Sequence, residues 1–323
     1  MTQTRSTFLV TGAYAAAGTA LASCGGAGTH ALSPTGQQGQ SRKTKDYFGL
    51  SVVRVLGEFE TAGRTDFAVW RPSNVTWYIR PSSGAATRTQ TWGVAGDIPV
   101  PGRYTRNNVA DVAVWHPADG KWYIAPSFQS SYSIPWGQAG DIPVPGSYFT
   151  SRASGGTDDL AVWRPSSGTW YVRSVSGNSF SQQWGQGGDI PVPGDYDGDG
   201  KTDLAVFRPS NGTWYVRPSS GGADVVQAWG TGNDVPVPAD YDGDGKTDFA
   251  VWRPSNQTWY IIPSSGGAVI TVQWGFGGDI PVPGTYDGTR NANIAVWRPS
   301  DGIWYTRGGA GNVQWGTGGD IPA

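Results

Sequence analysis

Two nine-residue segments carry aspartate at every second position, a spacing that favours binding of a metal ion. They read Asp195-x-Asp197-x-Asp199-Gly-Lys201-x-Asp203 and Asp240-x-Asp242-x-Asp244-Gly-Lys246-x-Asp248. Carboxylates at positions 1, 3, 5 and 9, together with the backbone carbonyl of the lysine at position 7, are hard oxygen ligands of the kind that Ca²⁺ takes. Without a cation, carboxylates packed this closely repel one another. The pattern therefore predicts two calcium sites.

The equivalent segments elsewhere in the chain are incomplete. The first of them has Glu58 and Glu60 but Ala62 at position 5, so it leaves a third calcium site undecided. The others keep too few carboxylates for the same chemistry, and one carries an insertion at residues 151–157. The Asp158-Asp159 pair beside this insertion is interpreted as part of a solvated loop. A catalytic carboxylate pair is the alternative for these two residues.

The aspartate segments belong to a repeat that spans most of the chain. A core related to Ala-Val-Trp-Arg-Pro-Ser occurs six times at intervals of about 45 residues, beginning at Ala68, Ala113, Ala161, Ala205, Ala250 and Ala295. In each copy a two-residue turn and a Trp-Tyr or Lys-Trp-Tyr stretch follow, and the copy ends in Trp-Gly and then Asp-Ile-Pro or Asp-Val-Pro. A fixed period of this length is typical of repeat architectures.

Turn signals within each repeat predict how its strands pair. Asn-Gly and Asp-Gly at the turn, as at Asn211-Gly212, favour a tight hairpin, so the strands on either side are expected to be antiparallel neighbours. Prolines in Ile-Pro-Val-Pro cannot donate ladder hydrogen bonds, which indicates a short edge strand or a connection between blades. Four short strands per repeat predict an all-β fold, a six-bladed β-propeller over residues 47–323. We expect the N-terminal strand, Ser51–Gly57, to close the ring by completing the last blade.

The two full repeats resemble a known family. The segments DYDGDGKTDLAVFRPS and DYDGDGKTDFAVWRPS are similar to the FG-GAP and VCBS-type repeats of integrin α-subunit propellers, secreted bacterial proteins and fungal lectins. The resemblance covers about residues 47–323 and its calcium motif is complete in two repeats of six. It implies a β-propeller with Ca²⁺ bound in loops between strands. It does not imply a single activity, because relatives include adhesins, lectins and accessory domains of polysaccharide-degrading enzymes.

The first residues of the chain are of a different kind. An apolar run, Phe8–Ala22, leads into Leu21-Ala22-Ser23-Cys24, which resembles the lipobox of bacterial lipoproteins. This resemblance implies a signal peptide over residues 1–23, lipidation of Cys24 and a flexible tether over residues 24–46. The mature protein is then expected outside the cytoplasm, anchored by its lipid to a bacterial membrane or cell surface. A plain signal peptide that leaves the protein secreted is the alternative.

Composition narrows the function classes. The net charge of −2 offers no basic surface for nucleic acid, so no nucleic-acid partner is expected. Two histidines and one cysteine are too few for a Ser-His-Asp or zinc site. We therefore expect a monomeric binding module rather than an enzyme, with a glycan or a protein as its ligand. A carbohydrate-active enzyme such as a polysaccharide lyase, and a purely structural scaffold lipoprotein, are the alternatives.

Aromatic and arginine residues of the repeats are candidate ligand contacts. Aromatic faces and guanidinium donors hold sugars and anions, and the predicted contacts are Trp184, Arg208, Trp229, Arg253 and Trp274. The alternative is that the tryptophans pack the blades and that each arginine pairs with an aspartate of its own blade or the next.

Overall fold

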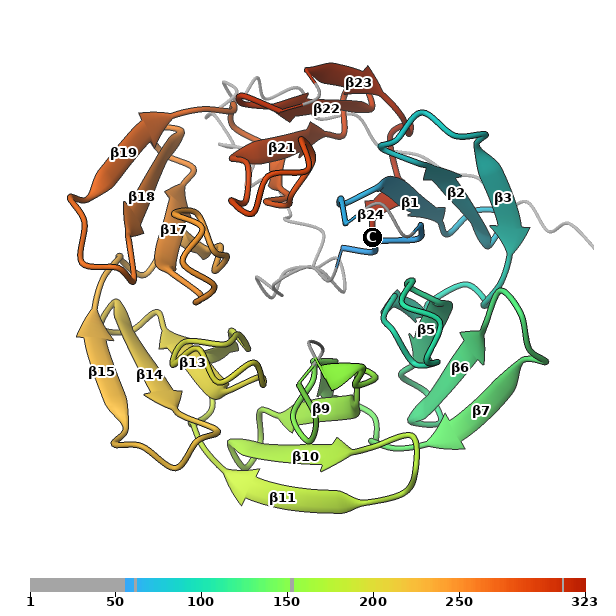
Figure 1. Cartoon of the computed structure of the whole chain (residues 1–323), viewed down its shortest axis with the longest axis horizontal. Coiled ribbons are helices and arrows are strands. Elements are labelled where there is room, and N and C mark those ends of the chain that lie inside the picture. The colour runs from blue at the N-terminus through green and yellow to red at the C-terminus, as the bar shows by residue number, and fades with distance from the viewer. Residues whose placement is uncertain (1–55, 61–62, 152–153, 310) are drawn as a thin grey trace, which may run out of the picture. The chain divides into compact units, whose positions relative to one another are not determined.

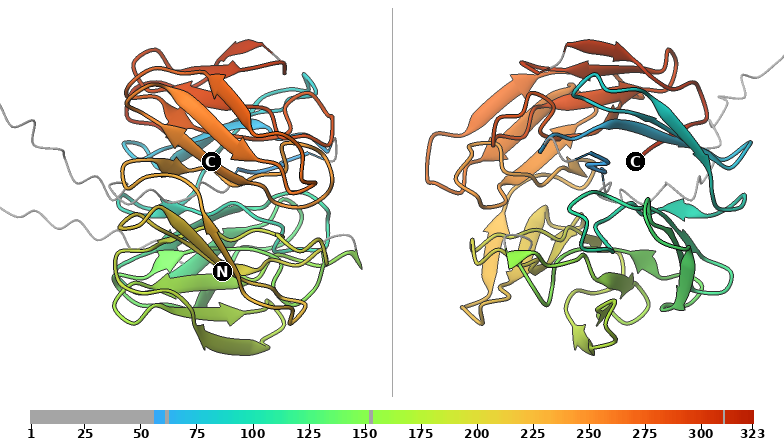
Figure 2. Two further views of the ribbon diagram at one scale, coloured as in Figure 1. Left: turned by 90° about the vertical axis from the view of Figure 1, so that its left-hand side faces the viewer. Right: turned by 45° about the vertical axis from the view of Figure 1, so that its right-hand side comes forward.

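The computed structural model describes residues 56–60, 63–151, 154–309 and 311–323, and this part of the chain is all-β. Six four-stranded antiparallel sheets stand around a central axis as the blades of a propeller (Figure 1). Figure 2 shows these blades in two further orientations. The prediction of a six-bladed β-propeller is confirmed. The predicted signal peptide, Cys24 and the tether lie outside the described residues.

Every blade has the same four strands, ordered from the centre outward. The innermost strands are β24 (Ile321–Pro322), β4 (Ile98–Pro99), β8 (Ile142–Pro143), β12 (Ile190–Pro191), β16 (Val235–Pro236) and β20 (Ile280–Pro281). The second strands are β1 (Phe67–Arg71), β5 (Val112–His116), β9 (Leu160–Arg164), β13 (Leu204–Arg208), β17 (Phe249–Arg253) and β21 (Ala295–Arg298). The third strands are β2 (Thr76–Arg80), β6 (Lys121–Ala125), β10 (Thr169–Arg173), β14 (Thr213–Arg217), β18 (Thr258–Ile262) and β22 (Ile303–Thr306). The outermost strands are β3 (Arg88–Thr91), β7 (Tyr132–Pro135), β11 (Ser179–Gln183), β15 (Val225–Ala228), β19 (Ile270–Gln273) and β23 (Asn312–Gln314).

Local chemistry explains the pairing within a blade. In blade four, which contains β12 to β15, β13 and β14 are antiparallel with Arg208 opposite Thr213, as the turn signals predict. Gly212 in the turn has φ 63°, a conformation that costs glycine little. Pro191 lies in the two-residue innermost strand, an edge position where its missing donor does no harm.

The ring closes differently from the prediction. We expected the N-terminal strand to complete the last blade, but β24 at the C-terminus completes the first, with Ile321 opposite Trp70 and Pro322 opposite Val69. The reason is that the Ile-Pro segment ending each repeat supplies the innermost strand of the next blade, and the sixth repeat supplies it to the first. Most of the predicted closing strand, residues 51–55, lies outside the described residues.

Tryptophans of the Trp-Gly class connect neighbouring blades. Each follows an outermost strand, is half-buried, and donates its indole N–H to a tyrosine carbonyl on the third strand of the next blade, at 3.0–3.2 Å. The pairs are Trp92–Tyr123, Trp136–Tyr171, Trp184–Tyr215, Trp229–Tyr260, Trp274–Tyr305 and Trp315–Tyr78. The last pair joins blade six to blade one, so these bonds also close the ring.

The core lies between the blades. Each cluster of buried side chains draws on two adjacent blades, as where Val69 of β1 packs with Trp297 and Trp304 of blade six. Trp304 is fully buried, and burying a side chain of this size makes a large hydrophobic contribution. The blades therefore stabilise one another, and this rigid ring fixes the positions of the loops at its inner side.

Candidate metal centres

The two full aspartate segments form loops in adjacent blades. Residues 195–203, the first aspartate loop, connect β12 to β13, and residues 240–248, the second aspartate loop, connect β16 to β17. Isolated bridges, Gly194 to Asp203 and Ala239 to Asp248, close the base of each loop. The loops also contact each other, because the N–H of Thr247 donates to the carbonyl of Asp195 at 2.6 Å.

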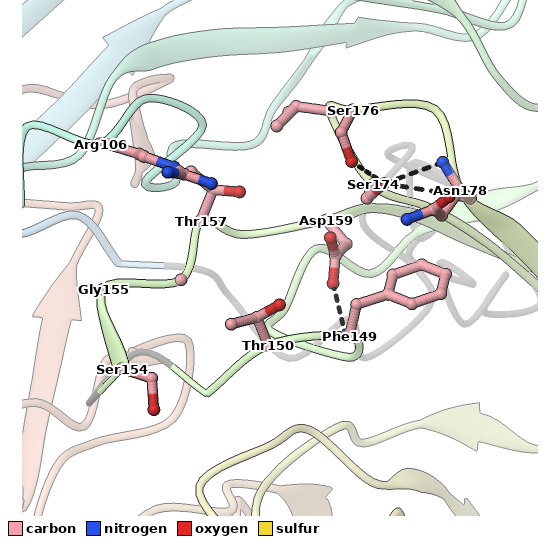
Figure 3. A pocket seen from close by; sticks show the side chains of 12 residues that line it. Arg106, Phe149, Thr150, Ser154, Gly155, Thr157, Asp159, Ser174, Ser176 and Asn178 are labelled. Carbon is pink, nitrogen blue, oxygen red and sulfur yellow. Dashed lines mark hydrogen bonds between the residues drawn. The ribbon is translucent and has the colours of Figure 1, made fainter.

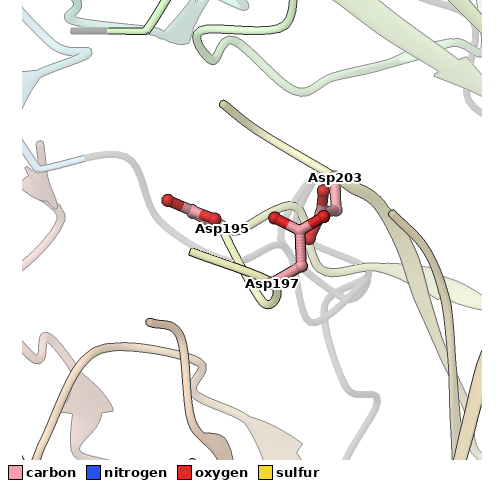
Figure 4. Close-up of side chains that lie close together, drawn as sticks. All are labelled: Asp195, Asp197 and Asp203. Carbon is pink, nitrogen blue, oxygen red and sulfur yellow. The ribbon is translucent and has the colours of Figure 1, made fainter. Parts of the chain in front are cut away.

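Three carboxylates of the first aspartate loop gather at one point. Asp195, Asp197 and Asp203 each offer an oxygen atom, and these atoms lie within 4.8 Å of one another (Figure 4). The backbone winds around Asp195, whose two oxygens accept the N–H groups of Gly198 and Gly200 at 2.7 and 2.9 Å. Both glycines have φ 84°, which is strained for any residue with a side chain. The glycines of the sequence motif are therefore what lets the loop tighten around its carboxylates.

The second aspartate loop repeats this arrangement with one difference. Asp240 accepts the N–H groups of Gly243 and Gly245 at 2.6 and 2.9 Å. The three carboxylate oxygens within 4.8 Å of one another come from Asp240, Asp242 and Asp244, so position 5 completes this cluster where position 9 completes the first. Each loop thus brings together three of its four predicted carboxylates.

The aspartate at position 9 also accepts backbone hydrogen bonds, a structural role that does not need a metal. Oδ2 of Asp203 accepts the N–H of Tyr196 at 2.8 Å and Oδ1 accepts the N–H of Ser219 at 2.7 Å. Asp66 holds the loop of blade one in the same way, although that loop lacks the full motif. Burial raises the pKa of Asp203 and of Asp66 to about 6. Position 9 therefore anchors the loop to the turn that follows the third strand.

That turn contains residues that the sequence interpretation missed. The hydroxyl of Ser219 donates to Asp199 at 2.8 Å and that of Ser220 donates to Asp197 at 2.6 Å. In blade five the hydroxyl of Ser264 donates to Asp244 at 2.9 Å. A signal was present, because Pro-Ser-Ser-Gly follows the third strand in the three repeats with acidic loops, at residues 81–84, 218–221 and 263–266.

Electrostatics of the loops favour a cation. Burial raises the pKa of Asp195 and of Asp240, and the neighbouring carboxylates of each loop raise it further. Lys201 compensates little, since its Nζ lies 4.0 Å from Asp199 and its side chain is 38% exposed. A divalent ion would offset both the desolvation and the repulsion, and an all-oxygen donor set suits Ca²⁺. The roles of the Lys201 and Lys246 carbonyls as ligands stay predictions.

The acidic residues of blade one are engaged in other contacts. Glu58 forms an ion pair with Arg103 of the blade-two loop. Glu60 accepts the N–H and the hydroxyl of Ser83 at 2.9 and 2.7 Å. In the described part of the chain, the groups of acidic side chains placed to hold a metal are those of the two aspartate loops.

The predicted ligand contacts have structural partners. Arg208 makes two parallel bonds to Asp189, at 2.8 and 2.9 Å, and Arg253 makes the same bonds to Asp234. Each guanidinium also lies over a tyrosine ring, 4.2 Å from Tyr215 in the case of Arg208. Trp184, Trp229 and Trp274 donate to the next blade as described above. The alternative of aspartate pairing is thus the observed arrangement for the arginines.

The Asp158-Asp159 pair is not solvated, so its interpretation as part of a solvated loop is wrong. The two residues are 1% and 2% exposed. Asp158 accepts the N–H of Arg103 at 2.8 Å, and Asp159 accepts the N–H groups of Tyr148 and Phe149 at 2.8 and 2.9 Å. The insertion hid the fact that Asp159 stands at position 9 of its repeat, where aspartate anchors the loop.

Comparison with known proteins identifies the repeat. Residues 195–251, which contain both aspartate loops, match the FG-GAP-like repeat family, as the sequence resemblance predicts. No curated protein sequence matches the chain. Among solved structures, an Agrocybe aegerita lectin described as recognising non-reducing terminal N-acetylglucosamine is similar, with a TM-score of 0.51, 12% identity, and coverage of 81% of this chain and 76% of that chain. A streptogramin B lyase is similar with a TM-score of 0.51, 11% identity, and coverage of 84% and 87%. At these identities the similarity establishes the propeller fold alone.

Proposed function

We propose that this FG-GAP-repeat propeller is a calcium-stabilised binding module that acts outside the cytoplasm and recognises carbohydrate. The observation that carries the proposal is the pair of aspartate loops, in which three carboxylate oxygens of each loop lie within 4.8 Å of one another. Because such clusters occur in two adjacent blades, the structure of the loops on this side of the ring would depend on bound cations. The lipobox-like segment supports export and lipid anchoring at Cys24.

Calcium would act on the framework that presents a ligand. Asp195, Asp197 and Asp203 would hold one ion, and Asp240, Asp242 and Asp244 a second. The bound ion neutralises the clustered carboxylates and fixes the loop that winds around them. The N–H of Thr247 in the second loop donates to the carbonyl of Asp195 in the first, so the backbones of the two loops are connected.

Similar backbone bonds connect the inner loops around the whole ring. They join Ala110 to Glu58, Asp158 to Arg103, Thr202 to Ser147, Thr247 to Asp195, Ala292 to Asp240 and Thr65 to Thr285, at 2.6–3.0 Å. A ligand that contacts several loops therefore meets a prearranged surface, which reduces the entropy lost on binding. The lectin among the similar structures supports the carbohydrate assignment only in showing that this fold can present a sugar site.

The test is retention of the purified full-length protein on a panel of immobilised polysaccharides, in calcium and again in excess chelator. We expect retention on at least one polysaccharide in calcium and its loss in chelator. Circular dichroism and tryptophan fluorescence in both conditions establish whether the fold persists. A folded protein that no polysaccharide retains in calcium would refute the carbohydrate assignment and direct the search to protein partners of the cell envelope.

A further inference from the structure

Blade three departs from blades one, four and five where its inner loop meets the turn after the third strand. In blade four the N–H of Ser219, from the Pro-Ser-Ser-Gly turn, donates to Oδ1 of the buried Asp203 at 2.7 Å. Blade three has Ser-Val-Ser-Gly-Asn at residues 174–178 instead, and the N–H of Ser174 donates to the carbonyl of Asn178 at 2.8 Å. The hydrogen bond thus stays within the turn, and among the described residues no donor of this turn reaches Asp159, the aspartate at position 9.

After this change only one of the two carboxylate oxygens of Asp159 accepts hydrogen bonds from the described residues. Its Oδ2 accepts two backbone N–H groups, from Tyr148 and Phe149. Among the described residues nothing donates to its Oδ1, although Asp159 is only 2% exposed. Oδ1 is not among the fully enclosed side-chain atoms that lack a partner in the described part of the chain, so it borders the pocket, where a donor from outside the chain can reach it. An acceptor in such a position is satisfied by water or by a donor group of a ligand.

Asp159 lines a pocket of about 190 Å³ in which other polar groups are also available (Figure 3). Arg106, from the inner loop of blade two, lies on one side of the pocket, and Ser176 and Asn178 lie across from it, with Asp159 between. Arg106 is exposed, and its guanidinium forms no ion pair with a described residue. The ring of Phe149 adds an aromatic surface to the lining.

We propose that this pocket binds one acidic monosaccharide unit, whose carboxylate pairs with Arg106 and whose hydroxyl donates to Oδ1 of Asp159. The inference rests on the proposed carbohydrate-binding function and names the sugar class and its site. The volume equals that of roughly six waters at about 30 Å³ each, which suits one small polar unit rather than a long chain segment. A planar guanidinium matches a carboxylate with two parallel bonds, and a carboxylate oxygen that borders a pocket accepts a hydroxyl donor. The side chains of Ser176 and Asn178 offer donors and acceptors to the remaining hydroxyls.

Asp159→Asn tests the acceptor with little risk to the fold. Blade six already carries Asn293 at the same position of its repeat, where Oδ1 accepts the N–H of Tyr286 at 2.8 Å. An asparagine at 159 is expected to orient its oxygen the same way and to direct its NH₂ group into the pocket, which converts an acceptor into a donor. Arg106→Gln removes the cation. Arg290→Gln is the matched control, because Arg290 is an exposed arginine in the same Thr-Arg-Asn sequence, in the inner loop of blade six.

The experiment is titration of the full-length protein in calcium with D-glucuronate, with methyl glucoside and with glycine, followed by ligand-observed NMR. We expect glucuronate to bind and methyl glucoside to bind at least tenfold more weakly, with Asp159→Asn and Arg106→Gln each weakening glucuronate at least tenfold and Arg290→Gln leaving it unchanged. Glucuronate binding that both pocket variants retain would overturn the inference. Binding of glycine in preference to glucuronate would overturn the sugar assignment, since an ammonium group would then be the donor to Asp159.

Retention on polysaccharide separates this inference from the proposed function. If the wild-type protein and both pocket variants are retained equally, the pocket is not the sugar site and the binding function stands. If no polysaccharide retains the wild-type protein but glucuronate binds the pocket, the site assignment stands and the polymer-binding function fails.

Discussion

Removing the bidentate ion pair of Arg208 and Asp189 is expected to lower the free energy of unfolding strongly, although the pair lies near the surface. Asp189 is almost fully buried, with a side chain 1% exposed, whereas that of Arg208 is 19% exposed. Arg208→Ala removes two charge-assisted bonds of 2.8 and 2.9 Å and leaves the carboxylate with one remaining donor, the N–H of Gln186. Stranding one member of a buried pair costs about 3–5 kcal/mol. Because Arg208 borders solvent and the N–H of Gln186 still donates to Asp189, we expect Arg208→Ala to lower the free energy of unfolding by about 3 kcal/mol, the lower end of that range.

Urea unfolding in fixed calcium, followed by tryptophan fluorescence, measures this change. Arg217→Ala is the control, because the Arg217–Asp224 pair has similar geometry but side chains 36% and 40% exposed, and exposed pairs contribute about 0.2–1 kcal/mol. The double variant Arg208→Ala with Asp189→Asn is expected to be more stable than Arg208→Ala alone, since no buried charge is then left unpaired. An Arg208→Ala protein no less stable than Arg217→Ala would refute the reasoning.

Three further perturbations follow from individual contacts. His116→Arg is expected to raise the melting temperature, because arginine would make two bonds to Asp97 where the imidazole makes one, and an unchanged or lower value counts against it. Val75→Gly should stabilise the protein by about 1 kcal/mol in urea unfolding, because Val75 is β-branched and has φ 51°; destabilisation would show that its packing outweighs the strain. In chelator, the free energy of unfolding should fall as pH rises from about 4 to about 6. Burial raises the pKa of Asp159 and Asp203 to about 6 in the folded protein. Between these pH values the folded state therefore holds protons that the unfolded state has lost, and raising the pH favours unfolding. Calcium should reduce the part of this loss of stability that comes from Asp203. A melting temperature that rises between about pH 4 and about pH 6 in chelator would contradict the raised pKa values of the two aspartates.

Local signals in the sequence were sufficient for the blades and for the two aspartate loops. Asn211-Gly212 specifies its hairpin through two adjacent residues, and the glycines at 198 and 200 specify the loop around Asp195 in the same way. These features depend on neighbours within a few positions, so a repeat that keeps the residues keeps the structure.

Contacts between distant segments were not predictable from the same signals. We predicted closure of the ring by the N-terminal strand, but closure depends on the pairing of Ile321 with Trp70, a contact between residues far apart in the sequence. The insertion at residues 151–157 broke the alignment of blade three with the other repeats, so the burial of Asp159 and the pocket beside it were not foreseen. The serines at 219 and 264 are a different case, since Pro-Ser-Ser-Gly recurs with the acidic loops and could have been recognised.

Calcium binding by the two aspartate loops is the central claim, and isothermal titration of the full-length protein after chelator removal tests it most directly. We predict two calcium ions per chain, with one lost in Asp197→Asn and one in Asp242→Asn, since each change removes a charged ligand and leaves the fold of the other loop intact. Asp224→Asn, which changes an exposed aspartate outside the loops, should bind two. No calcium uptake by the wild-type protein, or two ions bound by the Asp197→Asn and Asp242→Asn double variant, would contradict the account.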